Sequence, residues 1–296
     1  MMIPSNTHWI LSPHEPENAV ESFERSFEVC GQACEATLYV SARGVYSAEL
    51  NGRRLGPGVL APGWTSGSRL LYQRYDVTAY IQAQNRLSIG VARGWTADTL
   101  GWVPNAAIPR PQPALIACLE IAAADGTHLC IGTDEQWQVM TSPVLFAQLY
   151  HGETVDLTAA IRPLGHAVRA EVPVELLPQY GEWITEHERL APVACIRTPK
   201  GECVLDFGQN LTGYVELRIR GPRGGRVVLH HAETLDSDGN FYNENYRTAR
   251  NEMTYVLSGG DDVFKPRYTF QGFRYVRLSE YPLDTVELSA FTAVAV

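Results

Sequence analysis

The sequence is poor in lysine and in charged residues as a whole. Only Lys200 and Lys265 are lysines, and Asp, Glu, Lys and Arg make up 19% of the 296 residues, below the roughly 25% usual for globular domains. Acidic residues outnumber basic ones by 33 to 24, which gives a formal net charge of −9 at pH 7. Since binding to phosphates needs a positive field, this balance argues against a nucleic-acid partner.

Long apolar runs and the features of a secretory signal are also missing from the sequence. No run approaches the roughly 20 residues that a bilayer-spanning helix needs. Residues 1–9 lack the basic flank and apolar stretch of a secretory signal. The six cysteines show neither a CxxC spacing nor a paired zinc knuckle. We therefore expect a soluble, cytoplasmic chain with reduced thiols, no membrane partner, no metal and no cofactor.

What the sequence does contain is short stretches of alternating polar and apolar residues, such as 22–29, 37–41 and 213–220. Turn signals like Asn51-Gly52 separate them, and strands at roughly 8–12-residue spacing are typical of β-sandwiches. The clearest helical pattern is short and covers residues 76–81. The sequence thus predicts an all-β fold of two jelly-roll-like antiparallel β-sandwich domains.

A segment with several prolines separates the two predicted domains. Residues 163–192 show little sustained alternation, and we interpret them as a connector. The domains are then residues 1–162 and 193–296. No helical run is long enough for a helical barrel or for a sheet of βαβ units.

Tryptophans in predicted loops are the first candidates for binding. Trp95 and Asp98 follow a predicted strand, Trp102 is close to them, and Trp64 lies in a neighbouring loop. Indole rings stack on the apolar face of a pyranose, and loop carboxylates bind its hydroxyls. These four residues are therefore candidate sugar contacts. The alternative is that the tryptophans pack at the end of the sandwich.

The densest acidic stretch is a candidate for hydrolytic chemistry. Glycoside hydrolysis needs two carboxylates flanking one bond, and Glu233, Asp236 and Glu244 are the residues available here. The alternative is a strand that ends in a polar hairpin loop, with residues 236–239 as its turn. Asp236 and Asp238 also resemble the start of a calcium-binding loop, but the third ligand position and the closing glutamate of such a loop are missing.

Two adjacent histidines, His230 and His231, lie on a predicted strand. Their rings therefore point to opposite faces, so that one is packed and the other solvated.

Several longer motifs, taken in order, resemble one family. Tyr39–Tyr46, Leu50–Gly56, Leu60–Ser66 and Gly152–Asp156 are similar to the N-terminal module of bacterial α-L-rhamnosidases, which are family 78 glycoside hydrolases. Leu205–Val215, His231–Asp236 and Gly272–Val276 resemble the β-sandwich that follows that module.

The resemblance implies that this chain carries no catalytic residue. In that family the acid and base glutamates lie in an (α/α)6 barrel after the sandwiches, and this sequence ends at Val296, about where the barrel would begin. The barrel's Cys-Pro-x-Arg-Glu-Arg motif is absent. Some relatives bind rhamnose through calcium with an Asp-Asn pair. Ala42-Arg43-Gly44 stands at about that position here, and an arginine cannot hold a cation.

Three functions remain open. The first is a non-catalytic, carbohydrate-associated part of an α-L-rhamnosidase-like protein that binds rhamnose-containing glycans. The second is a structural module that supports a catalytic barrel or a homo-oligomer. The third is a stand-alone hydrolase that uses Glu233 and Glu244.

Overall fold

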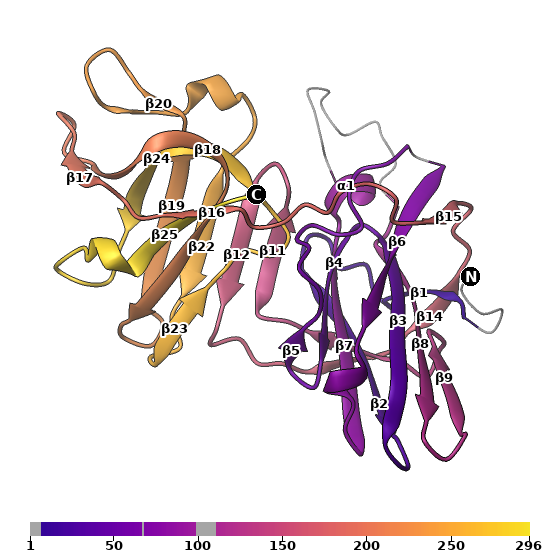
Figure 1. The fold of residues 1–296 in the computed structure, drawn as a ribbon. Coiled ribbons are helices and arrows are strands. Elements are labelled where there is room, and N and C mark those ends of the chain that lie inside the picture. The colour runs from indigo at the N-terminus through magenta and orange to yellow at the C-terminus, as the bar shows by residue number, and fades with distance from the viewer. Residues whose placement is uncertain (1–6, 67, 99–110) are drawn as a thin grey trace. The chain divides into compact units, whose positions relative to one another are not determined.

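The computed structural model describes residues 7–66, 68–98 and 111–296 (Figure 1). Regular structure in these residues is almost wholly strand. The helical pieces are α1 (Gly94–Ala97) and single 3-10 turns at Thr78–Tyr80, Glu244–Tyr246 and Leu288–Ala290. No helix in this part of the chain has the length and apolar character to cross a membrane. The strands form two compact units, and the all-β prediction of sandwich domains is confirmed.

Unit 1 is a sandwich of two sheets. The first has the order β14 (Val168–Ala170), β1 (Trp9–Leu11), β8 (Ala114–Ala123), β3 (Ala33–Arg43), β6 (Arg69–Asp76), β15 (Glu175–Pro178), with β9 (His128–Gly132) also paired to β8. The second has the order β13 (Pro163–His166), β10 (Gln138–Thr141), β2 (Glu21–Glu28), β7 (Gln84–Ala92), β4 (Val45–Leu50), β5 (Arg53–Arg54).

Alternation along each strand fills the space between these sheets. On β3, Leu38 and Val40 lie in the core, so Thr37 and Tyr39 lie on the opposite face of the sheet. Trp137, which is fully buried, is the largest side chain of this core. Burying a side chain of leucine size contributes about 1.5–3 kcal/mol, so the inward positions dominate the stability of the unit.

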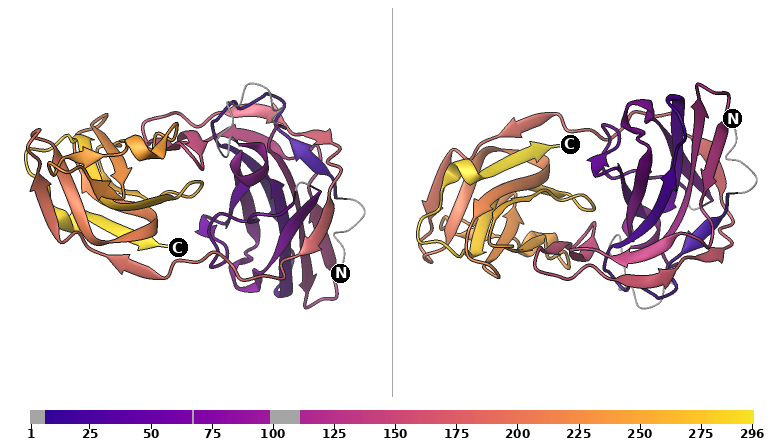
Figure 2. Two further views of the ribbon diagram at one scale, coloured as in Figure 1. Left: turned by 90° about the horizontal axis from the view of Figure 1, so that it is seen from above. Right: turned by 90° about the horizontal axis from the view of Figure 1, so that it is seen from below.

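Unit 2 is built on one large curled sheet, seen from two sides in Figure 2. Its order is β11 (Val144–Gln148), β12 (Gly152–Asp156), β22 (Glu252–Val256), β19 (Arg226–Ala232), β24 (Gln271–Glu280), β18 (Cys203–Arg220), β25 (Phe291–Ala295), β16 (Glu188–Leu190). β17 (Ala194–Arg197) and β23 (Asp261–Phe264) also pair with β18, and β20 (Thr234–Leu235) pairs with β21 (Phe241–Tyr242). Phe207, Phe273 and Phe291 all belong to its core, and the first two pack edge-to-face.

The structure divides the chain differently from the predicted boundaries. Residues 143–160 belong to unit 2, because β12 pairs in parallel with β22, with Gly152 opposite Glu252. The segment 163–192, interpreted as a connector, contributes β13, β14 and β15 to unit 1 and β16 to unit 2. Pairing between strands about a hundred residues apart leaves no trace in local alternation.

Candidate functional site

Two of the predicted sugar contacts, Trp64 and Trp95, meet in unit 1. Their ring centroids are 6.0 Å apart and their planes stand at 89°, an edge-to-face pair. The indole N–H of Trp95 donates to the carbonyl oxygen of Leu60 at 2.9 Å. Trp64 remains 65% exposed. The pair therefore consists of one anchored indole and one indole open to solvent.

Local backbone constraints hold this aromatic pair in place. Gly94, at the start of α1, has a φ of +51°, and a Cβ there would lie 2.2 Å from Val45 Cγ2 and 2.5 Å from the Val45 backbone nitrogen. Only glycine fits such a close approach. The backbone N–H of Tyr46 donates to the Ala61 carbonyl at 2.9 Å, which ties the Trp64 loop to β4.

Of the other two predicted sugar contacts, Asp98 and Trp102, the structure describes only Asp98. Asp98 follows α1 directly, and its backbone N–H donates to the Gly94 carbonyl at 3.2 Å. Trp102 lies outside the described residues. The site that the structure describes is therefore an exposed indole, its edge-on partner and a carboxylate three residues beyond that partner. An indole face of this kind accepts the C–H face of a sugar ring.

The predicted acidic site lies in unit 2. Glu233 is exposed just after β19, and its Oε1 accepts from Asn210 Nδ2 at 3.4 Å. Tyr246 donates its hydroxyl to the Gly272 carbonyl at 2.7 Å. Burial, together with the charge of Glu233, raises the pKa of Tyr246 above its usual range. Glu244 begins the 3-10 turn that carries Tyr246, so the structure brings Glu233 close to the end of this turn.

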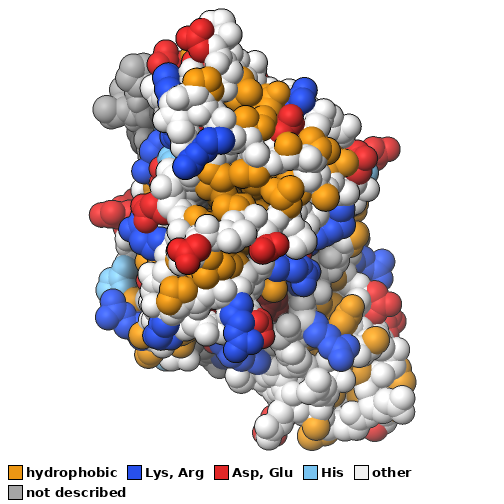
Figure 3. All heavy atoms as spheres, turned by 90° about the vertical axis from the view of Figure 1, so that its left-hand side faces the viewer, with side chains coloured by type: hydrophobic (Ala, Val, Ile, Leu, Met, Phe, Trp, Pro, Cys, Tyr) orange, Lys and Arg blue, Asp and Glu red, His pale blue; other side chains and the backbone are white. Residues whose placement is uncertain are grey.

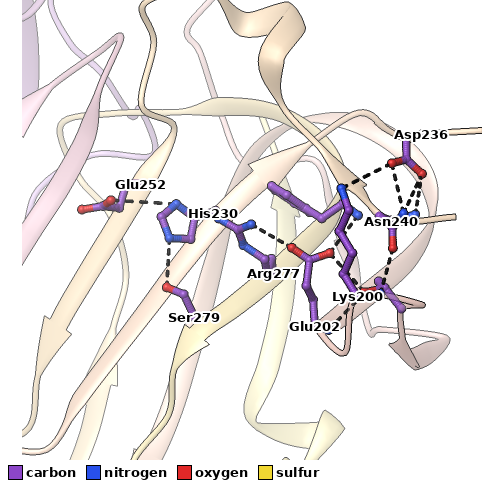
Figure 4. A network of polar contacts seen from close by, with 10 residues as sticks. Lys200, Glu202, His230, Asp236, Asn240, Glu252, Arg277 and Ser279 are labelled. Carbon is purple, nitrogen blue, oxygen red and sulfur yellow. Dashed lines mark hydrogen bonds and ion pairs between the residues drawn. The ribbon is translucent and has the colours of Figure 1, made fainter. Parts of the chain in front are cut away.

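Asp236 holds a turn. Its carboxylate accepts the backbone N–H of Asp238 at 3.0 Å. It also accepts the backbone N–H of Asn240 at 2.7 Å (Figure 4). These backbone hydrogen bonds lower its pKa. Lys200 Nζ lies 3.9 Å from the other carboxylate oxygen. This geometry is that of the polar hairpin turn considered as the alternative for residues 236–239. Within the described residues, no group of three or more His, Cys, Asp and Glu side chains is placed to hold a metal ion.

A polar network that sequence reasoning missed runs across the outer face of this sheet. Arg277 Nη1 donates to Glu202 Oε1 at 2.9 Å (Figure 4). His230 contacts Ser279 Oγ through Nε2 at 2.9 Å, and its Nδ1 lies 3.8 Å from Glu252. His230 and Arg277 face each other across β19 and β24. The residues come from four distant segments, so only the strand pairing could have revealed them.

The two adjacent histidines separate as expected for a strand. His231 is fully buried and packs edge-to-face on Phe273, with centroids 4.9 Å apart. Burial lowers its pKa to about 4. The His230 side chain is 16% exposed. The rings point to opposite faces and His231 is packed, as predicted, but His230 is mostly covered rather than solvated.

One buried carboxylate, Glu153 on β12, also escaped the sequence analysis. It is 2% exposed and accepts the backbone N–H groups of Arg267 at 3.3 Å and Tyr268 at 3.2 Å. Burial raises its pKa to about 7. A carboxylate so enclosed contacts the protein's own backbone, so we treat it as a structural group. Its motif, Gly-Glu-Thr-Val-Asp at 152–156, was the available signal.

Two family models match the chain in succession. The model described as the alpha-L-rhamnosidase N-terminal domain matches residues 31–167. The model described as the bacterial alpha-L-rhamnosidase concanavalin-like domain matches residues 196–296. The first match falls mainly in unit 1 and the second lies within unit 2.

Individual relatives bear out these matches. An α-L-rhamnosidase of Streptomyces avermitilis is 40% identical over 264 residues, which is 83% of this chain and 25% of the relative. The crystal structure of Streptomyces avermitilis α-L-rhamnosidase complexed with L-rhamnose superposes with a TM-score of 0.86 and 34% identity, over 94% of this chain and 28% of that one.

The α-L-rhamnosidase from Aspergillus terreus superposes with a TM-score of 0.90 and 28% identity, over 98% of this chain and 36% of that one. The chain spans 25% to 32% of the length of the curated relatives it matches.

Proposed function

The chain belongs to the bacterial α-L-rhamnosidase family through its N-terminal and concanavalin-like domains, and from this we propose that it is a non-catalytic part of such a protein that binds rhamnose-containing glycans. The relatives are named for their activity, and most of their length lies outside the matched region. The acidic cluster of unit 2 supports a non-catalytic role, since Asp236 holds its own turn through backbone N–H groups.

The observation that carries glycan binding is the exposed ring of Trp64. Its edge-on contact with Trp95, and the hydrogen bond from Trp95 to Leu60, fix the orientation of the pair before any ligand arrives. L-Rhamnose offers an apolar ring face and a methyl group for such a surface. A single stacking site of this kind binds weakly, and a Kd of about 1 mM corresponds to about −4 kcal/mol.

Calorimetry or protein-observed NMR with L-rhamnose and a rhamnosyl glycoside tests this proposal. We expect saturable binding in the millimolar range that Trp64→Ala removes. Leu145→Ala, which truncates another exposed hydrophobic side chain, in unit 2, is the matched control and should bind like the parent chain. No response to either ligand well above the millimolar range would refute glycan binding at Trp64.

A supporting role is the second candidate. Figure 3 looks onto a face of unit 2 where acidic and basic side chains are intermingled and hydrophobic ones gather between them. Val193, Val263 and Leu283 are exposed hydrophobic residues of this unit. Exposed apolar surface of this kind suits contact with another domain or with a second copy of the chain. Self-association on a sizing column, reversed by Val263→Ser, would support this role.

The third hypothesis, a stand-alone hydrolase that uses Glu233 and Glu244, requires that the chain hydrolyse an aryl rhamnoside and that Glu233→Gln abolish this activity. We expect the chain to show no such hydrolysis. For the compartment we propose the cytoplasm, where a reducing environment keeps the six cysteines as thiols.

A further inference from the structure

We propose that the outer face of the first sheet of unit 1 binds a neutral oligosaccharide chain, in a groove that crosses β15, β6, β3, β8 and β9. This inference rests on the proposed glycan-binding function and adds a second, longer site to the Trp64 pair. The residues that define the groove are Tyr39, Tyr72, Arg74, Glu120 and Trp183.

Strand register places these side chains in rows on one face. Tyr39 on β3 lies opposite Arg74 on β6 and opposite Cys118 on β8. In the next row Thr37 lies opposite Glu120. The five strands are hydrogen-bonded neighbours, and four spacings of about 4.8 Å give a width of about 19 Å. That width exceeds what a single sugar ring needs, so the groove suits a chain of several units.

Two adjoining cavities make up the groove. One, of about 450 Å³, is lined by Tyr39, Tyr72, Arg74, Pro178, Gln179 and Trp183. The other, of about 340 Å³, has Glu35, Thr37, Tyr39, Arg74, Glu120 and His128 among its lining residues. Tyr39 and Arg74 belong to both cavities, so the two hollows adjoin at these residues.

The aromatic end of the groove is held rigid by the protein itself. Tyr39 and Tyr72 are 6% and 9% exposed and form an edge-to-face pair at 6.2 Å, so they act as the floor. Trp183 packs on Tyr75 at 5.6 Å and lies so close to Gly58 that a Cβ there would be 2.3 Å from its ring. A wall fixed in advance lowers the ordering cost of binding.

Gln179 belongs to the same rigid wall. It accepts from Gln73 Nε2 at 2.9 Å and donates to the Gly181 carbonyl at 3.1 Å. Beyond the groove the same sheet face is covered, since Trp9, Leu70 and Ile116 pack there beneath Val172. The groove is the part of the face that this cover leaves open.

The polar groups of the groove select the class of ligand. Arg74 is exposed and makes no hydrogen bond or ion pair to any other described residue, so its N–H donors are available to hydroxyl oxygens. Glu35 and Glu120 at the other end accept from hydroxyls and repel an anionic chain. The backbone groups of paired strands are already bonded within the sheet, so a peptide strand has no ladder to join. A neutral, hydroxyl-rich chain satisfies all three conditions.

Calorimetry with neutral rhamnose-containing oligosaccharides of one to six units tests the groove on the full chain. We expect affinity to rise with chain length up to about the width of the groove. Arg74→Ala should weaken binding of the longest ligand roughly tenfold, as expected for the loss of charged hydrogen bonds. Arg53→Ala, which removes another exposed arginine of unit 1, is the control and should leave this affinity unchanged.

The outcomes separate the groove from the Trp64 site. Arg74→Ala should leave monosaccharide binding intact, whereas Trp64→Ala should remove it and spare the length dependence. Equal affinity for one and six units, or long-chain binding that depends on Trp64 and not on Arg74, would overturn the groove while leaving the proposed function standing. Tighter binding of an acidic oligosaccharide would overturn the assignment to neutral chains. Absence of all binding would remove both proposals.

Discussion

Replacing Glu153 by glutamine should change how the stability of the protein depends on pH. The folded chain holds this carboxylate at 2% exposure, where it accepts the backbone N–H groups of Arg267 and Tyr268. Burial raises its pKa to about 7, from 4.5 for the free side chain. The protonated form is therefore favoured in the folded state relative to the unfolded state.

The sign and the size of the effect follow from linkage. A raised pKa in the folded state means that the contribution to stability is fully present below about pH 4.5 and is lost as the pH rises through about 7. A shift of about 2.5 units at 1.36 kcal/mol each corresponds to about 3 kcal/mol. Glutamine keeps an oxygen for the two N–H groups and carries no charge, so Glu153→Gln removes this loss.

Urea unfolding at pH 5 and at pH 8 measures the difference. Between pH 5 and pH 8 the free energy of unfolding of Glu153→Gln should rise by about 2.5 kcal/mol relative to that of the parent chain, since part of the full effect lies below pH 5. Glu171→Gln, at an exposed carboxylate, is the control, and its free energy of unfolding should change with pH as that of the parent does. An equal change in the free energy of unfolding for Glu153→Gln and the parent between pH 5 and pH 8 would refute the reasoning.

Three further substitutions have defined outcomes. His231→Leu should make the protein more resistant to acid unfolding, because burial lowers the pKa of His231 to about 4. In the parent chain the stability that the neutral imidazole gives above about pH 6.5 is lost as the pH falls toward 4. Acid-unfolding curves of the two chains should therefore separate between these pH values. Arg274→Ala breaks a two-point ion pair with Asp206, at 2.8 and 2.9 Å, and should cost about 2 kcal/mol in urea unfolding, an expectation that a change below 0.5 kcal/mol would contradict. Gly94→Ala forces a Cβ against Val45 and should lower the thermal midpoint together with rhamnose binding; an unchanged midpoint would exclude the steric argument.

The sequence was informative where structure depends on neighbours along the chain. The alternating stretch 37–41 was predicted as a strand, and on β3 Leu38 and Val40 lie in the core while Tyr39 lies on the other face. The turn at Asp236 was also readable, because its acceptors and donors lie within four residues. Local chemistry is enough for such features.

Features that depend on strand pairing were out of reach. Tyr39 and Arg74 are 35 positions apart and become neighbours only through the register of β3 and β6. The same holds for Glu202, just before β18, and Arg277 on β24, which meet because these two strands pair. Trp64 and Trp95 were proposed as sugar contacts on chemical grounds, but their edge-on contact with each other was not predicted, because it depends on how distant segments pack.

The route of the backbone between the units has a consequence for biosynthesis. The described chain leaves unit 1 after residue 142, returns to it at residue 161 and leaves again after residue 184. The β11–β12 hairpin thus emerges from the ribosome long before its partner β22, and must wait unpaired until residues 252–256 follow. A polypeptide begun at residue 193 would lack this hairpin and would leave the edge of β22 open to strands of other molecules.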